Sequence, residues 1–141
     1  MKRVFLDTNI LMDGLDPQRE QYRWGQMLFT LSKNGAILGV TSTQSLVDFS
    51  YIYTKGHKKR LSELKEIMQG LDIILTLRET TRHDILMAAS HFTNDFEDAV
   101  QASVALNADC DVIVTNDKDF DDPFGLPIVS PDEFCREFIE E

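Results

Sequence analysis

The sequence predicts an α/β fold, a three-layer α/β/α sandwich around a central, mostly parallel sheet of about five strands. The first observation is that short apolar runs alternate along the chain with longer segments in which apolar residues recur at helical spacing. The second is that the apolar runs contain no alternating polar residues, as is typical of strands buried on both faces of a parallel sheet. Strands that alternate with helices form βαβ units with right-handed crossovers, so we expect helices on both faces of the sheet.

The chain is expected to form a single domain, residues 1–141. Its 141 residues are the length of one ordinary domain, and no repeat, low-complexity tract or linker divides them. The hydrophobic fraction of 43% is enough for a core. No run approaches the ~20 apolar residues of a membrane span, and the start of the chain resembles a strand rather than a signal peptide. The two cysteines, Cys110 and Cys135, form no metal or redox motif, so we expect a cytoplasmic protein.

The charge balance is strongly acidic, with 14 lysines and arginines against 24 aspartates and glutamates and a net charge of −10. This balance argues against non-specific capture of nucleic acid by a basic surface. It leaves room for a nucleic-acid enzyme whose acidic residues gather around cations. The three histidines lack the spacing of a zinc site.

The first strand is expected at residues 4–6, an apolar run too short for a helix, and Asp7 follows it directly. In open parallel sheets, ligands bind just beyond the carboxyl ends of the strands, which is where Asp7 would stand. Thr8 and Asn9 come next and can cap a helix or hydrogen-bond a carboxylate. The same three residues could also be only a turn or a helix cap.

The rest of the first half is expected to be helical around a second strand. Trp24, Met27, Leu28 and Leu31 recur at the spacing of one helix face. Residues 16–17 resemble an N-cap followed by proline at the first helical position, and glycines mark the helix ends. The expected elements are one or two helical turns within 8–15, a helix over 16–34, a strand over 36–40, a helix from 41–43 to Gly56, and a helix over 57–69 that ends at Gly70.

The second half is expected to contain three more strands and three more helices. Thr81 and Asp84 have the spacing of a capping box, and residues 93–95 can cap the following helix. The expected elements are strands at 71–75, 111–115 and 128–129, and helices over 81–90, from Asp95 to Ala108, and from Ser130 onward.

Four aspartates from separate segments are candidate catalytic residues. Asp117 comes just after an apolar strand, as Asp7 does. Asp98 lies three residues after Asp95 at a helix start, so the two share a face, although both could simply cap the helix and complement its dipole. Asp48 lies in an apolar stretch of the helix after the second strand, where it needs a partner or a metal unless it points to solvent.

Carboxylates gathered in one cleft repel one another, which raises their pKa values unless cations neutralise them. Oxygen ligands without histidine or cysteine suit Mg²⁺ or Mn²⁺. Two such ions about 3.5–4 Å apart can activate a water and stabilise the leaving oxygen of a phosphodiester. The four aspartates therefore predict nuclease chemistry.

An ordered set of motifs along the whole chain resembles the PIN domain. The motifs are Leu6-Asp7-Thr8-Asn9, the segment from Asp95 to Ala99, Val114-Thr115-Asn116-Asp117 with Asp119-Phe120, and the ending at residues 130–134. The resemblance implies a Mg²⁺- or Mn²⁺-dependent endoribonuclease that leaves a 5′-phosphate and a 3′-hydroxyl, often the VapC-type toxin of a toxin–antitoxin pair. It also implies an RNA substrate, a cognate antitoxin as partner, and often a homodimer.

The resemblance assigns a role to each matching residue. It implies that Asp7, Asp98 and Asp117 bind the metal ion and that Asp48 completes the catalytic set. The family commonly has a glutamate at the position of Asp48, so this shorter side chain could act through a water. The residues expected to position these acids without contacting the metal are Asn9, Asp95, Thr115 and Asn116.

The densest basic cluster, from Lys55 to Arg60, includes Lys55, Lys58, Lys59 and Arg60. These side chains could bind RNA phosphates beside the cleft. They could equally be a solvated helix start, since charge runs usually lie on the surface.

Two other functions remain open from the sequence. The departure at Asp48 would suit a catalytically silent PIN-like module that binds RNA or protein. A receiver-like signalling domain also has an acidic pocket at strand ends, but it normally has adjacent acids after the first strand and a lysine ending a late strand. Here Thr8 and Asn9 follow Asp7, and Thr115 ends the late strand, so this fit is poor.

Overall fold

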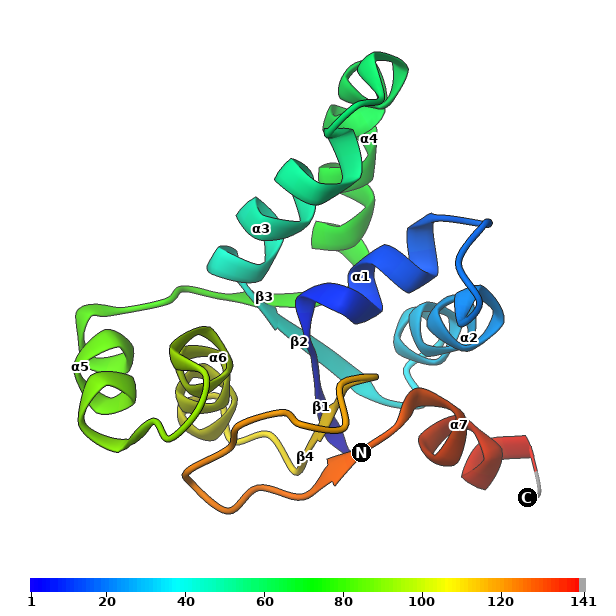
Figure 1. The fold of residues 1–141 in the computed structure, drawn as a ribbon. Coiled ribbons are helices and arrows are strands. Elements are labelled where there is room, and N and C mark those ends of the chain that lie inside the picture. The colour runs from blue at the N-terminus through cyan, green and yellow to red at the C-terminus, as the bar shows by residue number, and fades with distance from the viewer. Residues whose placement is uncertain (140–141) are drawn as a thin grey trace.

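The computed structural model describes residues 1–139, and its centre is a five-stranded sheet in which every neighbouring pair is parallel. The strands lie in the order β3-β2-β1-β4-β5, so the first strand occupies the middle of the sheet (Figure 1). Their bounds are β1 Arg3–Leu6, β2 Leu38–Ser42, β3 Thr76–Arg78, β4 Val112–Val114 and β5 Ile128–Val129.

Of the seven helices within residues 1–139, five cover the two faces of this sheet. Figure 1 shows α5 and α6 on one side and α1, α2 and α7 on the other. This arrangement confirms the predicted α/β/α sandwich with five parallel strands. The bounds are α1 Thr8–Leu15, α2 Tyr22–Lys33, α3 Thr43–Thr54, α4 Lys58–Ile74, α5 Arg82–His91, α6 Phe96–Asn107 and α7 Pro131–Ile139.

Burial on both faces of β1 explains its unbroken apolar run. Successive side chains of a strand point to opposite faces. Phe5 packs in a cluster with the alanines of α6, whereas Val4 and Leu6 pack in a second cluster with α1, α2, α3 and α7. All three side chains are completely buried, so both outer layers are held against the same strand.

Two glycines set the position of α1, the helix that follows Asp7. A Cβ atom on Gly25 of α2 would lie 2.4 Å from the backbone nitrogen of Gly14 at the end of α1. The backbones of the two helices therefore approach too closely for any larger residue at Gly25. This contact fixes α1, and with it the carboxyl edge of β1.

Helices α3 and α4 form a hairpin that extends away from the sheet (Figure 1). Its tip is tied to the body of the protein by Arg60. The guanidinium Nη1 donates to the carbonyl of Tyr53 at 3.1 Å, lies over the Tyr53 ring at 4.5 Å, and pairs through Nη2 with Asp16 at 3.5 Å.

The predicted third strand at residues 71–75 is wrong. These residues continue α4 as far as Ile74, and the strand is Thr76–Arg78. Gly70 does not end the helix because Leu71 and Leu75 are buried in the core, and the Leu75 N–H donates to the Leu71 carbonyl at 2.8 Å. Burial of these two leucines outweighs the roughly 1 kcal/mol by which a glycine weakens a helix.

The predicted helix start at residues 16–17 is also wrong, because α2 begins at Tyr22. Asp16 ends α1 instead, with its N–H donating to the Met12 carbonyl at 2.9 Å. The second strand runs on to Ser42, two residues further than expected, because residues 41–42 pair with β3. The capping box at Thr81 and Asp84 is confirmed. Within residues 1–139, no helix combines the length and the apolar character needed to cross a bilayer.

Candidate active site

Asp7 stands where β1 ends and caps α1. Its Oδ1 accepts from the backbone N–H of Ile10 at 3.1 Å, and its Oδ2 accepts from the Thr115 hydroxyl at 2.6 Å. The side chain is only 3% exposed. Burial raises the pKa of Asp7 to about 6, and the negative charges of Asp98 and Asp13 add to the effect. Asp7 is therefore a cap, as the alternative interpretation proposed, and also a buried acid with an unusually high proton affinity.

Thr115 connects Asp7 to Asp117. Its hydroxyl donates to Asp7 and accepts from the backbone N–H of Asp117 at 3.1 Å. The parallel pairing of Leu6 with Val114 places the two strand ends side by side. The predicted meeting of these two strand ends is thus present in the structure.

Asp98 reaches the same region from the first turn of α6. Asp95 caps this helix by accepting from the Asp98 N–H at 3.0 Å, while Asp98 Oδ2 accepts from the backbone N–H of Asp121 at 3.2 Å. Burial raises the pKa of Asp98 to about 6, and repulsion from Asp95, Asp117 and Asp121 raises it further. Asp98 thus lies close enough to both Asp7 and Asp117 to interact with each of them electrostatically.

Asp121 is a carboxylate that the sequence analysis missed. It accepts from the Thr93 backbone N–H at 2.9 Å, the Thr93 hydroxyl at 2.7 Å, the Asn94 N–H at 3.0 Å and the Asp95 N–H at 3.2 Å. The hydrogen bonds from Thr93 are the main cause that lowers its pKa to about 2. Asp121 is therefore an ionised carboxylate that links the loop after β4 to the residues just before α6. Its position beside two further loop residues, Asp122 and Pro123, gave no sequence signal for this role.

Asp13 is a second missed acid, only 2% exposed on α1. It accepts from Arg19 Nε at 2.8 Å and from the side-chain amide of Asn116, and burial raises its pKa. Asn116, predicted to support the metal-binding acids, thus bonds to Asp13. Asn9 is exposed on α1. Asp13 could have been found in the sequence, because it is an aspartate among the apolar residues of the first helix. The same kind of position identified Asp48.

Asp48 lies half-buried on α3 and forms a pair with Glu97 of α6. It accepts from Gln44 Nε2 at 3.0 Å, and its carboxyl hydrogen-bonds with that of Glu97. Partial desolvation is the main cause that raises the pKa of Glu97 to about 7, although the residue stays exposed to solvent, and repulsion from Asp48, Asp95 and Asp98 adds to the shift. A hydrogen bond between two carboxyl groups requires a proton, and the raised pKa of Glu97 places that proton on Glu97. Glu97 thus connects Asp48 electrostatically to the group around Asp98.

The donor set suits a hard divalent cation. The ion pairs within residues 1–139 are Arg19–Asp13 and Arg60–Asp16, so no lysine or arginine there forms one with Asp7, Asp98 or Asp117. The same residues contain no group of three Asp, Glu, His or Cys side chains spaced to enclose an ion. Mg²⁺ typically needs only one or two carboxylates, with waters and substrate phosphates completing its shell. The carboxylates fit such an ion.

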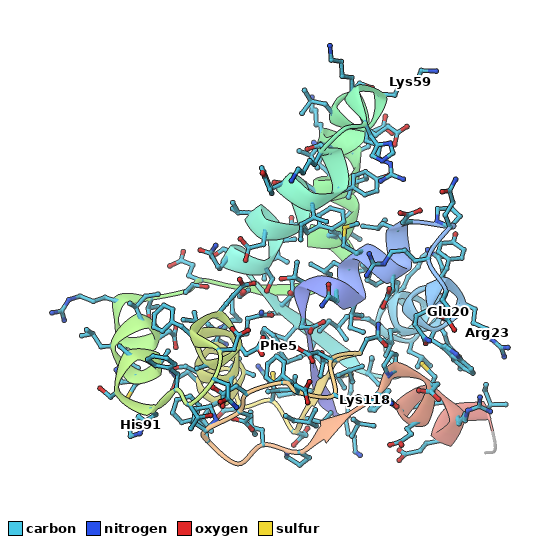
Figure 2. The ribbon with its side chains drawn as sticks, viewed as in Figure 1. Phe5, Glu20, Arg23, Lys59, His91 and Lys118 are labelled. Carbon is cyan, nitrogen blue, oxygen red and sulfur yellow. The ribbon has the colours of Figure 1, made fainter. Side chains whose placement is uncertain are left out.

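The basic cluster lies on the hairpin formed by α3 and α4. Figure 2 shows Lys59 at the hairpin tip, far along it from the sheet. Lys55 Nζ lies over the Tyr51 ring at 5.6 Å, and Arg60 braces the hairpin through its contacts with Tyr53. The structure therefore gives Arg60 a structural role, and binding of RNA by the exposed Lys55, Lys58 and Lys59 stays a prediction.

Comparisons with known proteins agree with this architecture. A family model described as PIN domain matches residues 3–119. Ribonuclease VapC1 of Aquifex aeolicus (strain VF5) is 28% identical over 137 residues, which are 96% of this chain and 94% of that protein. The structure of VapBC2 from Rickettsia felis, bound to a DNA fragment from their promoter, contains a chain that superposes with a TM-score of 0.63 at 20% identity, covering 91% of this chain and 98% of that one. Mycobacterium tuberculosis VapC20, a Sarcin-Ricin loop cleaving toxin, superposes with a TM-score of 0.64 at 15% identity, covering 83% of this chain and 92% of that one.

The family match spans all four candidate acids, Asp7, Asp48, Asp98 and Asp117. It removes the receiver-like alternative and confirms the resemblance seen in the motifs. The chain belongs to the PIN domain family.

Proposed function

We propose that this protein is a divalent-metal-dependent endoribonuclease and the toxin of a toxin–antitoxin pair. The observation that carries the proposal is the convergence of Asp7, Asp98 and Asp117 at the carboxyl edge of the sheet, with Thr115 bridging two of them. Burial is the main cause of the high pKa values of Asp7 and Asp98, and repulsion from neighbouring acids adds to it. Within residues 1–139 no lysine or arginine forms an ion pair with either of them. Membership of the PIN family and the similarity to ribonuclease VapC1 support the same activity.

Asp7, Asp98 and Asp117 are the residues that would surround Mg²⁺ or Mn²⁺, with one or two of them contacting the ion and the others reaching it through its waters. When bound, such an ion lowers the pKa of its water and neutralises charge on a phosphodiester. Thr115 orients Asp7 and fixes the backbone at Asp117, which keeps the two acids at the edge. Asp95 and Asp121 hold the start of α6 and so position Asp98.

The proposed partners follow from the relatives. The Rickettsia felis structure contains a VapBC2 complex on promoter DNA, so we propose a cognate antitoxin for this chain as well. The substrate is RNA, by analogy with ribonuclease VapC1. A homodimer and a cytoplasmic location stay predictions.

The test is cleavage of total RNA by the purified protein with Mg²⁺, Mn²⁺ or a chelator, with product ends mapped. We expect metal-dependent cuts that leave 5′-phosphates, loss of cleavage in Asp98→Asn, and full activity in the exposed control Asp72→Asn. Metal should also raise the melting temperature of the wild type and of Asp72→Asn, since a ligand that binds only the folded state stabilises it, and should raise it less in Asp98→Asn. Cleavage that survives both the chelator and Asp98→Asn would contradict the proposal.

A catalytically silent binding module is the second candidate, favoured by the pairing of Asp48 with Glu97. It predicts RNA or protein binding, with no metal-dependent cuts in the same assay. The two candidates are therefore separated by one set of reactions.

A further inference from the structure

A pocket of about 530 Å³ opens beside Asp117, at the carboxyl ends of β4 and β5. Its walls come from the loop after β4, from the start of α7, and from Gln21 just before α2. A second hollow of about 380 Å³ shares Gln21 and Asn116 with it, so the two are neighbours. The larger pocket also shares Thr115 and Asp117 with the acidic site. An RNA strand with a phosphate at the acids would thus have a neighbouring nucleotide at this pocket.

The polar lining of the pocket is rich in hydrogen-bond acceptors. Asp132 and Glu133, in the first turn of α7, contribute carboxylates, and hydrogen bonding from Ser130 lowers the pKa of Asp132, which keeps it ionised. Asn116 donates its amide nitrogen to Asp13, and its amide oxygen accepts no hydrogen bond from the described residues. A ligand with N–H donors therefore complements these groups.

The remaining walls suit the rest of a nucleotide. Phe120 and Ile128 supply apolar surface for the face of a base. Lys118, which also lines the pocket, is exposed and forms no ion pair within residues 1–139. Figure 2 shows it close to the segment that carries β5 and α7. A lysine so placed can bind a phosphate of the strand.

We propose that this pocket is a subsite for a nucleobase next to the scissile phosphate and that its acceptor-rich lining selects guanine. The proposal rests on the ribonuclease function proposed above. Guanine is the RNA base whose Watson–Crick edge places two donors, the N1–H and the exocyclic amino group, side by side. These two donors match the two oxygens of one carboxylate, and we assign Glu133 to this role because it is the more exposed of the two acids that α7 contributes to the lining. Adenine and cytosine each place an acceptor beside their amino group, and uracil flanks its single N–H with two acceptors.

Cleavage of matched oligonucleotides tests the selection of guanine. Each has one cleavage site in an otherwise uniform sequence, and the flanking base is guanine, hypoxanthine, adenine, cytosine or uracil. Hypoxanthine differs from guanine only in lacking the exocyclic amino group. We expect guanine to be preferred over hypoxanthine by at least about fivefold in kcat/KM, the lower end of what a bidentate base contact provides. Equal rates for all five bases would overturn the subsite while leaving the ribonuclease function intact.

The variant Glu133→Gln assigns the preference to the pocket. It should bring guanine and hypoxanthine to within about twofold of each other, whereas Glu137→Gln, an exposed acid on the same helix outside the pocket lining, should keep the wild-type preference. Gln21→Ala, which changes a lining residue from another segment of the chain, should weaken the binding of all bases. An unchanged preference in Glu133→Gln would overturn this assignment.

Binding measured without cleavage separates the two proposals. Guanosine 5′-monophosphate is titrated against the protein and against Glu133→Gln, with amide chemical shifts of residues 116–120 as the readout. We expect saturable shifts that are weaker with inosine 5′-monophosphate and weaker in the variant. Such binding in a protein that cleaves no RNA would support the pocket and contradict only the ribonuclease function. Shifts that are equal for both nucleotides, or absent, would overturn the pocket.

Discussion

The Thr115 hydroxyl donates to Asp7 Oδ2 at 2.6 Å, across a sequence separation of 108 residues. The oxygen of this Thr115 hydroxyl also accepts from the Asp117 N–H. One hydroxyl therefore sets the relative position of two acids that follow adjacent strands. Supporting residues of this kind typically change metal affinity or activity by about 10- to 100-fold when they are removed.

Thr115→Val should therefore reduce cleavage by about 10- to 100-fold with little loss of secondary structure. The hydrogen bond lowers the pKa of Asp7, so its loss should raise that pKa above about 6 and shift Mn²⁺ binding to higher pH. Mn²⁺ titrations across pH 5.5–8 measure both effects. Thr115→Ser keeps the hydroxyl and should behave as wild type; a serine variant as impaired as the valine variant would contradict the role of the hydroxyl.

The raised pKa values of Asp7 and Asp98 predict that, without metal, the free energy of unfolding decreases as the pH rises. The folded protein holds protons on these acids up to about pH 6, whereas an unfolded aspartate titrates near 3.8, so the folded state binds more protons between these values. The free energy of unfolding should decrease across this window, by about 3 kcal/mol for Asp7 alone. Urea unfolding from pH 4 to 7 in a chelator measures the decrease.

Asp7→Asn should accordingly raise the metal-free stability at pH 7 by about 1–3 kcal/mol and flatten the pH profile. Asp72→Asn, at an exposed position, should do neither. Asp121 has the opposite effect on the pH profile. Its pKa is lowered to about 2, so the ionised carboxylate stabilises the folded protein, and this stability is lost only as the pH falls below about 4. A metal-free profile of wild type that rises from pH 4 to 7 would contradict the uncompensated burial of Asp7.

Asp48 can be assigned by variants of both members of its carboxyl pair. If Asp48 contributes to the metal site, Asp48→Ala should weaken Mn²⁺ binding and cut the cleavage rate by orders of magnitude, and Asp48→Glu should keep most activity because it restores the family's usual side chain. Glu97→Gln should retain a hydrogen bond to Asp48 and have a smaller effect. If Asp48 is only a surface acid, both Asp48 variants should stay within about 0.5 kcal/mol of wild type in stability. Neither variant should then change Mn²⁺ binding or the cleavage rate.

Arg60 should affect stability rather than RNA binding. Arg60→Ala removes the contacts with Tyr53 and Asp16 and should lower the free energy of unfolding by about 1–2 kcal/mol. Lys59→Ala, at the exposed tip, should change stability by less than about 0.5 kcal/mol. Chemical denaturation separates the two, and filter binding of RNA to both variants tests the basic cluster. An RNA-binding defect in Arg60→Ala with normal stability would contradict the structural role.

The parts of the site that could be predicted from the sequence depend on local signals. Asp7 and Asp117 directly follow apolar strands, and parallel strands bring such ends to one edge, so their meeting needed no knowledge of side-chain packing. Asp95 was recognisable as a cap from its position alone.

The parts that were missed depend on partners far away in the chain. Asp121 acquires its role from the donors of Thr93, 28 residues earlier, and Glu97 from Asp48 on another helix. The third strand was misplaced because the burial of Leu71, which is set by tertiary packing, carries α4 through Gly70.

The strand order has a consequence for the synthesis of this protein. Asp7 is made before Asp117, but β1 lies between β2 and β4, and Asp117 takes its place only when β4 pairs with β1. The hydrogen bonds of Asp121 with Thr93 and Asp98, which order the start of α6, form later still. A nascent chain that lacks Asp121 therefore cannot complete the acidic site, because Asp98 would lack its bond from the Asp121 N–H. One that also lacks Thr115 would leave Asp7 without its bond to the Thr115 hydroxyl. The ribosome that makes this chain is therefore exposed to an assembled site only after Asp121 has been added and β4 has paired with β1.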